Sequence, residues 1–165
     1  MDKTSYANLA RAWEYVENHA YSRQTQALLD AREQAAQCGL AQGSAAQAQL
    51  LHTLACMMRS ISVITIGSGS LVEIVQLVDA LHGTGQLTAV DSSTQGIALI
   101  RKMFFALSDT TQTTLRAVNA PVNVFLPRLN GTDYDLIIVS GDAANYLDTF
   151  AQAPRLLREH VGEHD

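Results

Sequence analysis

A short apolar stretch that ends in a Gly-Ser-Gly turn constrains this chain more than any other feature. Residues 62–66 read Ser-Val-Ile-Thr-Ile, a run too short for a helix and rich in β-branched side chains. Gly67-Ser68-Gly69 follows, and residues 71–78 then have the amphipathic pattern of a helix. A strand, a glycine turn and a helix N-terminus in succession leave free backbone N–H groups beside a gap that a ligand can enter.

A second predicted strand, residues 86–91, ends in the carboxylate of Asp91. In nucleotide-binding α/β folds, an acidic residue at this position binds the ribose hydroxyls. The full glycine fingerprint has a third glycine where this chain has Val72, so the glycines alone are a weak signal. The alternative, in which they only make a tight turn and Asp91 only caps a helix, stays open. The combination of turn and acid favours a nucleoside site.

The hydrophobic pattern predicts a helical first third followed by alternating strands and helices. Helices are predicted over 7–19, 24–38, 45–59, 70–82, 93–107, 122–129 and 143–158, and strands over 61–66, 86–91, 113–118 and 134–140. Repeated β-α-β units with right-handed crossovers give an α/β fold, a doubly wound Rossmann-like and mostly parallel sheet. We expect one domain, with an N-terminal helical cap over 1–60 and a nucleotide-binding part over 61–165. The apolar run at 136–139 indicates a strand covered on both faces.

Composition excludes several function classes. The net charge is −5, and Arg101-Lys102 is the only adjacent basic pair, better explained by a solvated helix face than by a nucleic-acid surface. No apolar run reaches membrane-spanning length, and the N-terminus lacks the apolar core of a signal peptide, so we expect no membrane partner. Cys38 and Cys56 are interpreted as free thiols in a reducing cytoplasm. The histidines are scattered, and none pairs with a cysteine or carboxylate at metal-ligand spacing, so we assign no metal site from them.

The order of these features resembles a known family, the S-adenosylmethionine-dependent O-methyltransferases of the catechol/caffeoyl-CoA type, particularly their small bacterial members. The resemblance is carried by the helical lead-in, Gly-x-Gly after the first strand and the acid after the second. Leu126-Pro127-Arg128-Leu129 before the strand at 134–139 also matches. The similarity runs from about residue 27 to 160. It implies S-adenosylmethionine as cofactor, a small-molecule hydroxyl group as methyl acceptor, and a homodimer.

The resemblance also assigns roles to individual residues. Gly67 and Gly69 would line the methionine and ribose portion of the cofactor, and Asp91 would hold the ribose hydroxyls. Ser92 would lie beside the adenosine, and Asn119 and Ala120 would lie near the adenine.

The chain departs from the family pattern at its catalytic positions. Thr65 stands where the family has an acid, Ser140 where it has a metal-binding aspartate, and Ala143 where it has the lysine that helps deprotonate the acceptor. We count Thr65 and Ser140 among the cofactor-binding residues and keep Asp142 as the candidate catalytic residue. Where this sequence ends, the family continues with a fifth strand and an Asp-Asn metal pair. We therefore expect a C-terminally truncated, metal-independent and impaired methyltransferase whose fourth strand has one unpaired edge.

Two other functions remain open. A non-catalytic member, in which the fold serves as a binding or dimerisation module, would account for Ser140 and Ala143. A nicotinamide-binding Rossmann domain is disfavoured, because about 60 helical residues precede the first strand whereas such domains usually begin at that strand.

Overall fold

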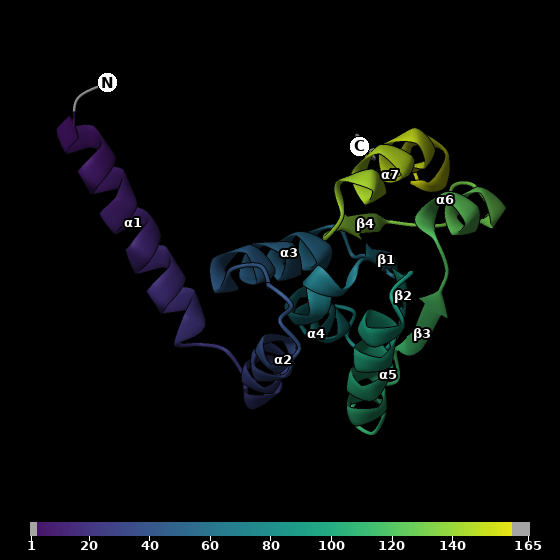
Figure 1. Ribbon diagram of the computed structural model, residues 1–165, viewed down its shortest axis with the longest axis horizontal. Helices are drawn as coiled ribbons and strands as arrows, with labels where there is room; N and C mark the ends of the chain where they lie inside the picture. Colours follow the sequence, from purple (N-terminus) through teal and green to yellow (C-terminus); the bar gives the residue numbers. More distant parts are fainter. Residues whose placement is uncertain (1–2, 160–165) are drawn as a thin grey trace, which may run out of the picture.

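A four-stranded parallel sheet forms the centre of the protein (Figure 1). The computed structural model describes residues 3–159. The strands are β1 (Ser62–Ile66), β2 (Gln86–Asp91), β3 (Thr114–Asn119) and β4 (Leu136–Val139). Their order is β3-β2-β1-β4, and every pairing between neighbours is parallel. The direction of the chain across the sheet reverses between β1 and β4. In folds of this type, ligands bind outside the carboxyl ends of the strands at such a switch point.

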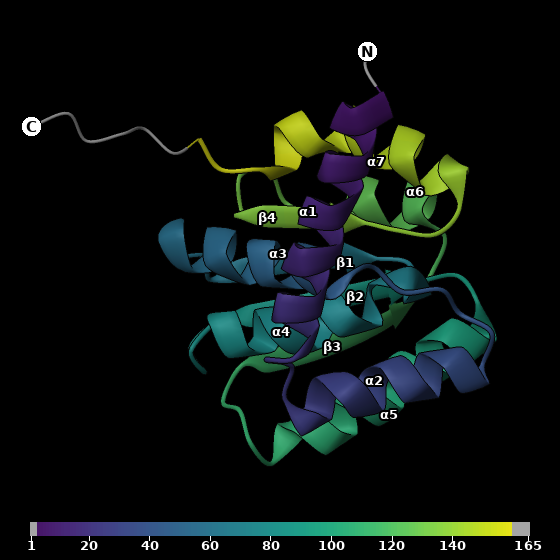
Figure 2. The same cartoon turned by 90° about the vertical axis from the view of Figure 1, so that its left-hand side faces the viewer.

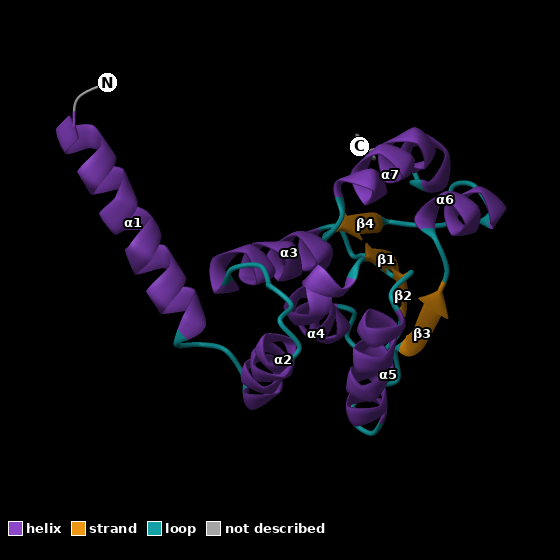
Figure 3. Ribbon diagram, viewed as in Figure 1, coloured by secondary structure: helices purple, strands orange, loops and turns teal. Residues whose placement is uncertain are grey.

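Seven α-helices and two 3₁₀ turns accompany the strands in the described residues (Figure 3). They are α1 (Lys3–Tyr21), α2 (Gln26–Gln37), α3 (Ala45–Met57), η1 (Ser68–Ser70), α4 (Leu71–Ala80), α5 (Thr94–Ser108), α6 (Val122–Phe125), η2 (Leu126–Arg128) and α7 (Ala143–Leu156). The predicted doubly wound α/β fold behind N-terminal helices is therefore confirmed. Each predicted element occurs, with ends displaced by a few residues.

The two faces of the sheet are buried by different helices. Val63 of β1 faces the core that α2, α3, α4 and α5 cover, whereas Ile64 and Ile66 face the core under α6, η2 and α7. This alternation follows from the two-residue period of a strand and explains why β1 is apolar on both sides. Figure 1 shows α6 and α7 on one side of the strands and α2, α3, α4 and α5 on the other.

Helix α1 stands apart from the body of the molecule and is anchored at its C-terminal half (Figures 1 and 2). The Glu17 carboxylate accepts hydrogen bonds from the backbone N–H groups of Ala45 and Ala46, at 2.7 and 2.9 Å. These donors belong to the first turn of α3, where no helical carbonyl is available to them. Ser44 is the N-cap of α3, because its hydroxyl accepts from the Gln47 N–H at 3.0 Å.

Strand β4 differs from its prediction in length and in burial. It covers Leu136–Val139, of which Ile138 is buried and the other three residues are partly buried. Leu136 and Ile138 pack against one core and Ile137 and Val139 against the other, so the strand is covered on both faces, but incompletely. Tyr134 instead forms a parallel bridge with Leu157 just after α7. The Asp135 carboxylate fixes this arrangement, since it binds Arg158 at 3.0 Å and accepts the Ser62 N–H at 2.8 Å. Along Leu136–Val139 no second strand pairs within residues 3–159, as predicted.

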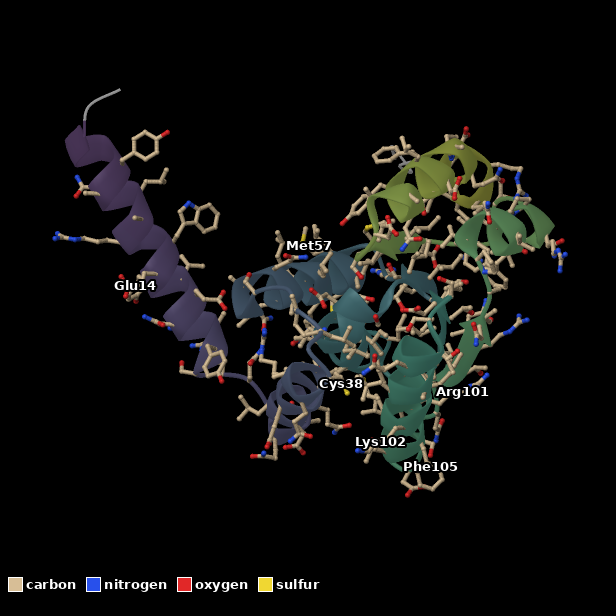
Figure 4. The ribbon with its side chains drawn as sticks, viewed as in Figure 1. Glu14, Cys38, Met57, Arg101, Lys102 and Phe105 are labelled. Atoms are coloured by element: carbon tan, nitrogen blue, oxygen red, sulfur yellow. The ribbon has the colours of Figure 1, made fainter. Side chains whose placement is uncertain are left out.

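The surface agrees with the interpretation of the basic pair. Arg101 and Lys102 are both exposed on α5 (Figure 4), which confirms the solvated helix face. Within the described part of the chain, no helix is both long and apolar enough to span a bilayer. His160 and His164, two of the scattered histidines, lie outside the described residues.

Candidate functional site

The glycine turn after β1 is held in a conformation that requires glycine. Gly67 has a φ of +89°, a region that L side chains rarely adopt. Its N–H donates to the Val90 carbonyl at 2.8 Å, and its own carbonyl accepts the Ser70 hydroxyl at 2.8 Å. A Cβ at Gly67 would also collide with the carbonyl oxygen of Ser140. The glycine is therefore needed for the turn and for the close approach of the chain after β4.

Ser140 joins the end of β4 to this turn. Its N–H and its hydroxyl both donate to the Ile66 carbonyl, at 2.8 and 3.0 Å, and the hydroxyl lies 3.3 Å from the Gly67 carbonyl. A Cβ at Gly69 would stand 3.2 Å from the Ser140 Oγ. The Ser140 side chain and main chain thus connect the end of β4 to the glycine turn across the switch point.

Asp91 lies directly beside the same turn, at the end of β2. Its side chain is buried, and Oδ1 accepts the Ser93 N–H at 2.6 Å. Among the described residues, no hydrogen bond is made to Oδ2. A Cβ at Gly96 would stand 2.7 Å from this Oδ2 and 2.9 Å from the Cβ of Ser68. The carboxylate therefore lies between the glycine turn and the start of α5, with one oxygen free to accept from a ligand.

The remaining predicted nucleoside residues surround Asp91. Asn119 is its partner in the β2–β3 register, and the Ala120 N–H donates to the Asp91 carbonyl at 3.2 Å. Ser92 and Asn119 are exposed, and Ala120 is partly exposed. The fold thus brings the predicted glycines, acid and β3 residues to one end of the sheet.

Two predicted residues are placed differently. Thr65 is only 1% exposed in the interior of β1, and its hydroxyl has no hydrogen-bond partner. Asp142 is exposed and serves as the N-cap of α7, with Oδ1 accepting the Ala144 N–H at 3.0 Å. Both assignments stay predictions. Thr65 has almost no access to the surface, and one carboxylate oxygen of Asp142 is already used as the cap of α7.

A residue that the sequence analysis missed occupies the start of α4. The Gln42 Oε1 accepts the Val72 N–H at 3.2 Å, while its Nε2 donates to the Ser68 carbonyl at 3.2 Å. The N-terminus of a helix is where an anionic group of a ligand would bind. One of the backbone N–H donors at the start of α4, that of Val72, is therefore already bound by Gln42. No local pattern reveals this contact, because Gln42 lies in the loop between α2 and α3.

The first turn of α4 also contains a buried acid, Glu73. Burial raises the pKa of its carboxyl above the ordinary value, and the Glu73 N–H and the charge of Arg32 offset only part of this. Oε1 packs against Gly43, and Oε2 has no partner. In its ionised form this carboxyl would oppose the binding of a second carboxylate at the same helix end.

The arrangement fits the two halves of S-adenosylmethionine unequally. A ribose would find the free Oδ2 of Asp91, and a base would find Asn119 and Ala120 at the end of β3. The amino-acid half carries a carboxylate, which would meet Gln42 and Glu73 at the start of α4. The residues present fit the nucleoside half, and the amino-acid half requires Gln42 to move.

The described residues contain no metal-ligand cluster, and their two cavities lie away from the predicted cofactor residues. Within residues 3–159 no group of three or more His, Cys, Asp or Glu side chains is arranged to hold a metal ion. Two cavities, of about 580 and 190 Å³, lie around α2 and the far end of α4. Neither is lined by a predicted cofactor residue.

The expectation that no histidine pairs with a cysteine or a carboxylate at metal-ligand spacing is wrong for His52, although no metal-binding group results within residues 3–159. His52 Nε2 lies 3.6 Å from the Cys56 Sγ, and His52 Nδ1 lies 3.7 Å from an Asp79 carboxylate oxygen. The signal was present in the sequence, because residues four apart on a helix share a face.

Comparison with known proteins gives consistent relatives. No family model matches the chain. A protein of Mycobacterium sp. (strain JLS) named "Putative O-methyltransferase" is 27% identical over 128 residues, which cover 78% of this chain and 58% of that protein. An O-methyltransferase from Bacillus cereus, solved with S-adenosylhomocysteine, superposes with a TM-score of 0.73 at 16% identity, covering 90% of this chain and 70% of that one. A Klebsiella pneumoniae structure described as "a putative O-methyltransferase" superposes with a TM-score of 0.75 at 21% identity. The match covers 90% of this chain and 69% of that one.

These likenesses show the fold, a Rossmann-like doubly wound α/β fold that the chain shares with these solved structures. The chain spans about 58% of the length of the curated relatives that it matches.

Proposed function

We propose that this protein is an S-adenosylmethionine-dependent O-methyltransferase of the catechol/caffeoyl-CoA type that acts on a hydroxyl group of a small molecule. The observation that carries the proposal is the Asp91 carboxylate, buried beside the glycine turn at the carboxyl ends of the strands. The similarity to proteins named as O-methyltransferases supports the same activity.

In this proposal the chain's own residues mainly bind and orient. Asp91 Oδ2 accepts hydrogen bonds from the ribose, and Ser92, Asn119 and Ala120 contact the nucleoside. Gly67 and Gly69 keep side chains out of the turn, so that the cofactor can approach the main chain. The Ser140 hydroxyl, donated to the Ile66 carbonyl, holds the turn in place. Thr65 is kept in the proposed cofactor site, although it lies in the interior of β1.

S-adenosylmethionine supplies an electrophilic methyl group, so much of the catalysis is the positioning of the acceptor oxygen. Asp142 is the proposed acceptor of the hydroxyl proton, in competition with its role as the cap of α7. Ala143 provides no base, and Ser140 is a poor ligand for Mg²⁺. We therefore propose a metal-independent enzyme with reduced activity.

The protein is further proposed to act in the cytoplasm as a homodimer. Free Cys38 and Cys56 suit a reducing compartment. Apolar side chains are exposed along one face of α1 and along the outer side of α3, where Figure 4 labels Met57. Large exposed apolar faces of this kind mark protein–protein interfaces. A second copy of this chain is the proposed partner for both.

Calorimetry with S-adenosylhomocysteine tests the proposed function through Asp91. A carboxylate that accepts ribose hydroxyls makes charge-assisted hydrogen bonds of roughly 1.5–3 kcal/mol each. Asp91→Asn should therefore weaken binding at least about tenfold, with little change in melting temperature. Asp109→Asn, an exposed acid just after α5, is the matched control and should bind like the wild type. Equal affinity in Asp91→Asn, or tighter binding of NAD, would contradict the proposal.

A further inference from the structure

A cysteine, two histidines and an aspartate meet at the far end of α4, away from the glycine turn. Cys56 and His52 lie on α3, whereas Asp79 and His82 lie at the end of α4 and just after it. The Cys56 Sγ is 3.6 Å from His52 Nε2 and 3.9 Å from His82 Nε2. Helix α4 begins at the glycine turn, and its ten residues place the cluster about 15 Å from that turn.

The hydrogen bonds of His52 determine which ring nitrogen faces the thiol as an acceptor. His52 Nδ1 lies 3.1 Å from the Gln76 carbonyl oxygen, which can only accept, so Nδ1 must carry the proton. In the neutral ring, Nε2 is then the unprotonated nitrogen, and it points at the Cys56 Sγ. The Asp79 carboxylate lies 3.7 Å from the same Nδ1. This is the arrangement of nucleophile, base and orienting group that activates a thiol.

The cluster is open to small molecules. Cys56 and His52 are partly exposed, and Asp79 and His82 are exposed. His82 lines the cavity of about 580 Å³, His52 lines the cavity of about 190 Å³, and Asp79 lines both. Cys38, the other free cysteine, lies at the end of α2 (Figure 4) and makes no side-chain hydrogen bond to a titratable group among the described residues. The chain thus contains an internal reference thiol.

We propose that Cys56 is a modification site that reacts with small hydroperoxides, with His52 as the group that takes and returns the thiol proton. The Cys56 sulfur attacks one oxygen of the peroxide, so that an S–O bond forms while the O–O bond breaks. The sulfur is oxidised by two electrons, and the peroxide is reduced. The proton held on His52 Nε2 passes to the departing oxygen, which leaves as water or an alcohol. The product at Cys56 is a sulfenic acid.

The experiment compares the two cysteines within one protein. The reduced full chain is treated with hydrogen peroxide in the presence of dimedone, which traps sulfenic acids, and labelling of the two cysteine peptides is followed by mass spectrometry. Because His52 Nε2 lies where it can take the thiol proton as the sulfur attacks, Cys56 should be labelled at least about tenfold faster than Cys38 in the native protein. In urea the two rates should become similar, since the cluster is then dispersed. Similar rates in the native protein would overturn the proposal.

Two matched variants assign the role of His52. His52→Asn keeps an N–H near the Gln76 carbonyl but lacks the acceptor nitrogen, so labelling of Cys56 should slow at least about tenfold while Cys38 is unaffected. His82→Asn removes the other imidazole, and asparagine tolerates the φ of +48° at this position. It should keep most of the Cys56 rate. An unchanged rate in His52→Asn, or a larger loss in His82→Asn, would overturn the assignment.

Discussion

The side chain of Gln42 accepts a hydrogen bond from the Val72 backbone N–H, at 3.2 Å, and so closes the helix end that follows the glycine turn. Its amide also donates to the Ser68 carbonyl, at 3.2 Å. The loop between α2 and α3 is thereby connected to the proposed cofactor site. The N-terminal region therefore contributes a side chain to the start of α4 and does not only cover the sheet.

Removal of the Gln42 side chain should make the α4 donor available to the cofactor's carboxylate. We expect Gln42→Ala to bind S-adenosylhomocysteine more tightly, by a factor of about two to ten, because a net hydrogen bond is worth about 0.5–1.5 kcal/mol. The variant should also be less stable by about 1 kcal/mol, since the helix start loses a cap. Calorimetry and thermal unfolding measure the two effects. Gln37→Ala, an exposed position on α2, should change neither, and weaker binding by Gln42→Ala would contradict the prediction.

Glu17 should make the stability of the α1–α3 contact dependent on pH. Burial alone would raise the pKa of its carboxyl, but the Ala46 and Ala45 N–H groups, Ser44 and Arg32 together lower it below the ordinary 4.5. A lowered folded-state pKa gives a stabilisation that is present above pH 4.5 and is lost as the pH falls through the lower value. The difference in melting temperature between wild type and Glu17→Gln should therefore be largest near neutral pH and shrink under acidic conditions.

Glu14 offers the control for this measurement. It is an exposed acid on the same helix and points away from α3 in Figure 4. Glu14→Gln should follow the wild type at every pH. A Glu17→Gln difference that stays constant from neutral to acidic pH would show that the carboxylate charge does not stabilise the contact.

Methyl transfer, if measured with a panel of catechols and flavonoids, should not depend on a divalent ion. The Ser140 hydroxyl is engaged with the Ile66 carbonyl, and Asp142 is the cap of α7. Turnover should therefore be unchanged by EDTA and by added Mg²⁺. Loss of activity with EDTA and its recovery with Mg²⁺ would contradict this expectation and make Asp142 a metal ligand. Binding of the cofactor without any turnover would instead favour a non-catalytic module.

The sequence was sufficient for what depends on local periodicity. The apolar run before Gly67 and the carboxylate of Asp91 predict two strands and the end of the sheet where they meet, because parallel strands place their carboxyl ends together. The sequence was not sufficient for contacts between distant segments. Gln42 reaches α4 across 30 residues, and Asp135 binds Arg158 across 23. Such pairs depend on the packed fold, and nothing in their local sequence distinguishes them. The division at residue 60 stays a prediction.

Ser140 illustrates a different limit. The resemblance interpreted it as a lost metal ligand, which describes what the residue lacks. The structure shows what it does, since its hydroxyl donates to the Ile66 carbonyl and its carbonyl fills the space that a side chain at Gly67 would need. Substitution patterns alone do not reveal a new hydrogen bond to the main chain.

The last prediction concerns the exposed apolar stripe of α1, formed by Tyr6, Leu9, Trp13 and Val16. These positions recur every three or four residues and lie on one side of the helix, with Trp13 64% exposed. Among the described residues, the outer edge of β4 has no strand partner, and apolar side chains are exposed on the outer side of α3, so both offer further surface for association. We expect the chain of 17.9 kDa to have twice this mass by light scattering at micromolar concentration. Trp13→Ser should raise the dimer dissociation constant roughly thirtyfold, because buried aromatic anchors contribute about 2 kcal/mol or more.

Tyr15→Ser is the control, since Tyr15 is 72% exposed on the opposite side of α1. A stable wild-type monomer with a sharp unfolding transition at high temperature would refute the dimer. An equal loss in both variants would place the interface elsewhere, and α3 would then be the next surface to change.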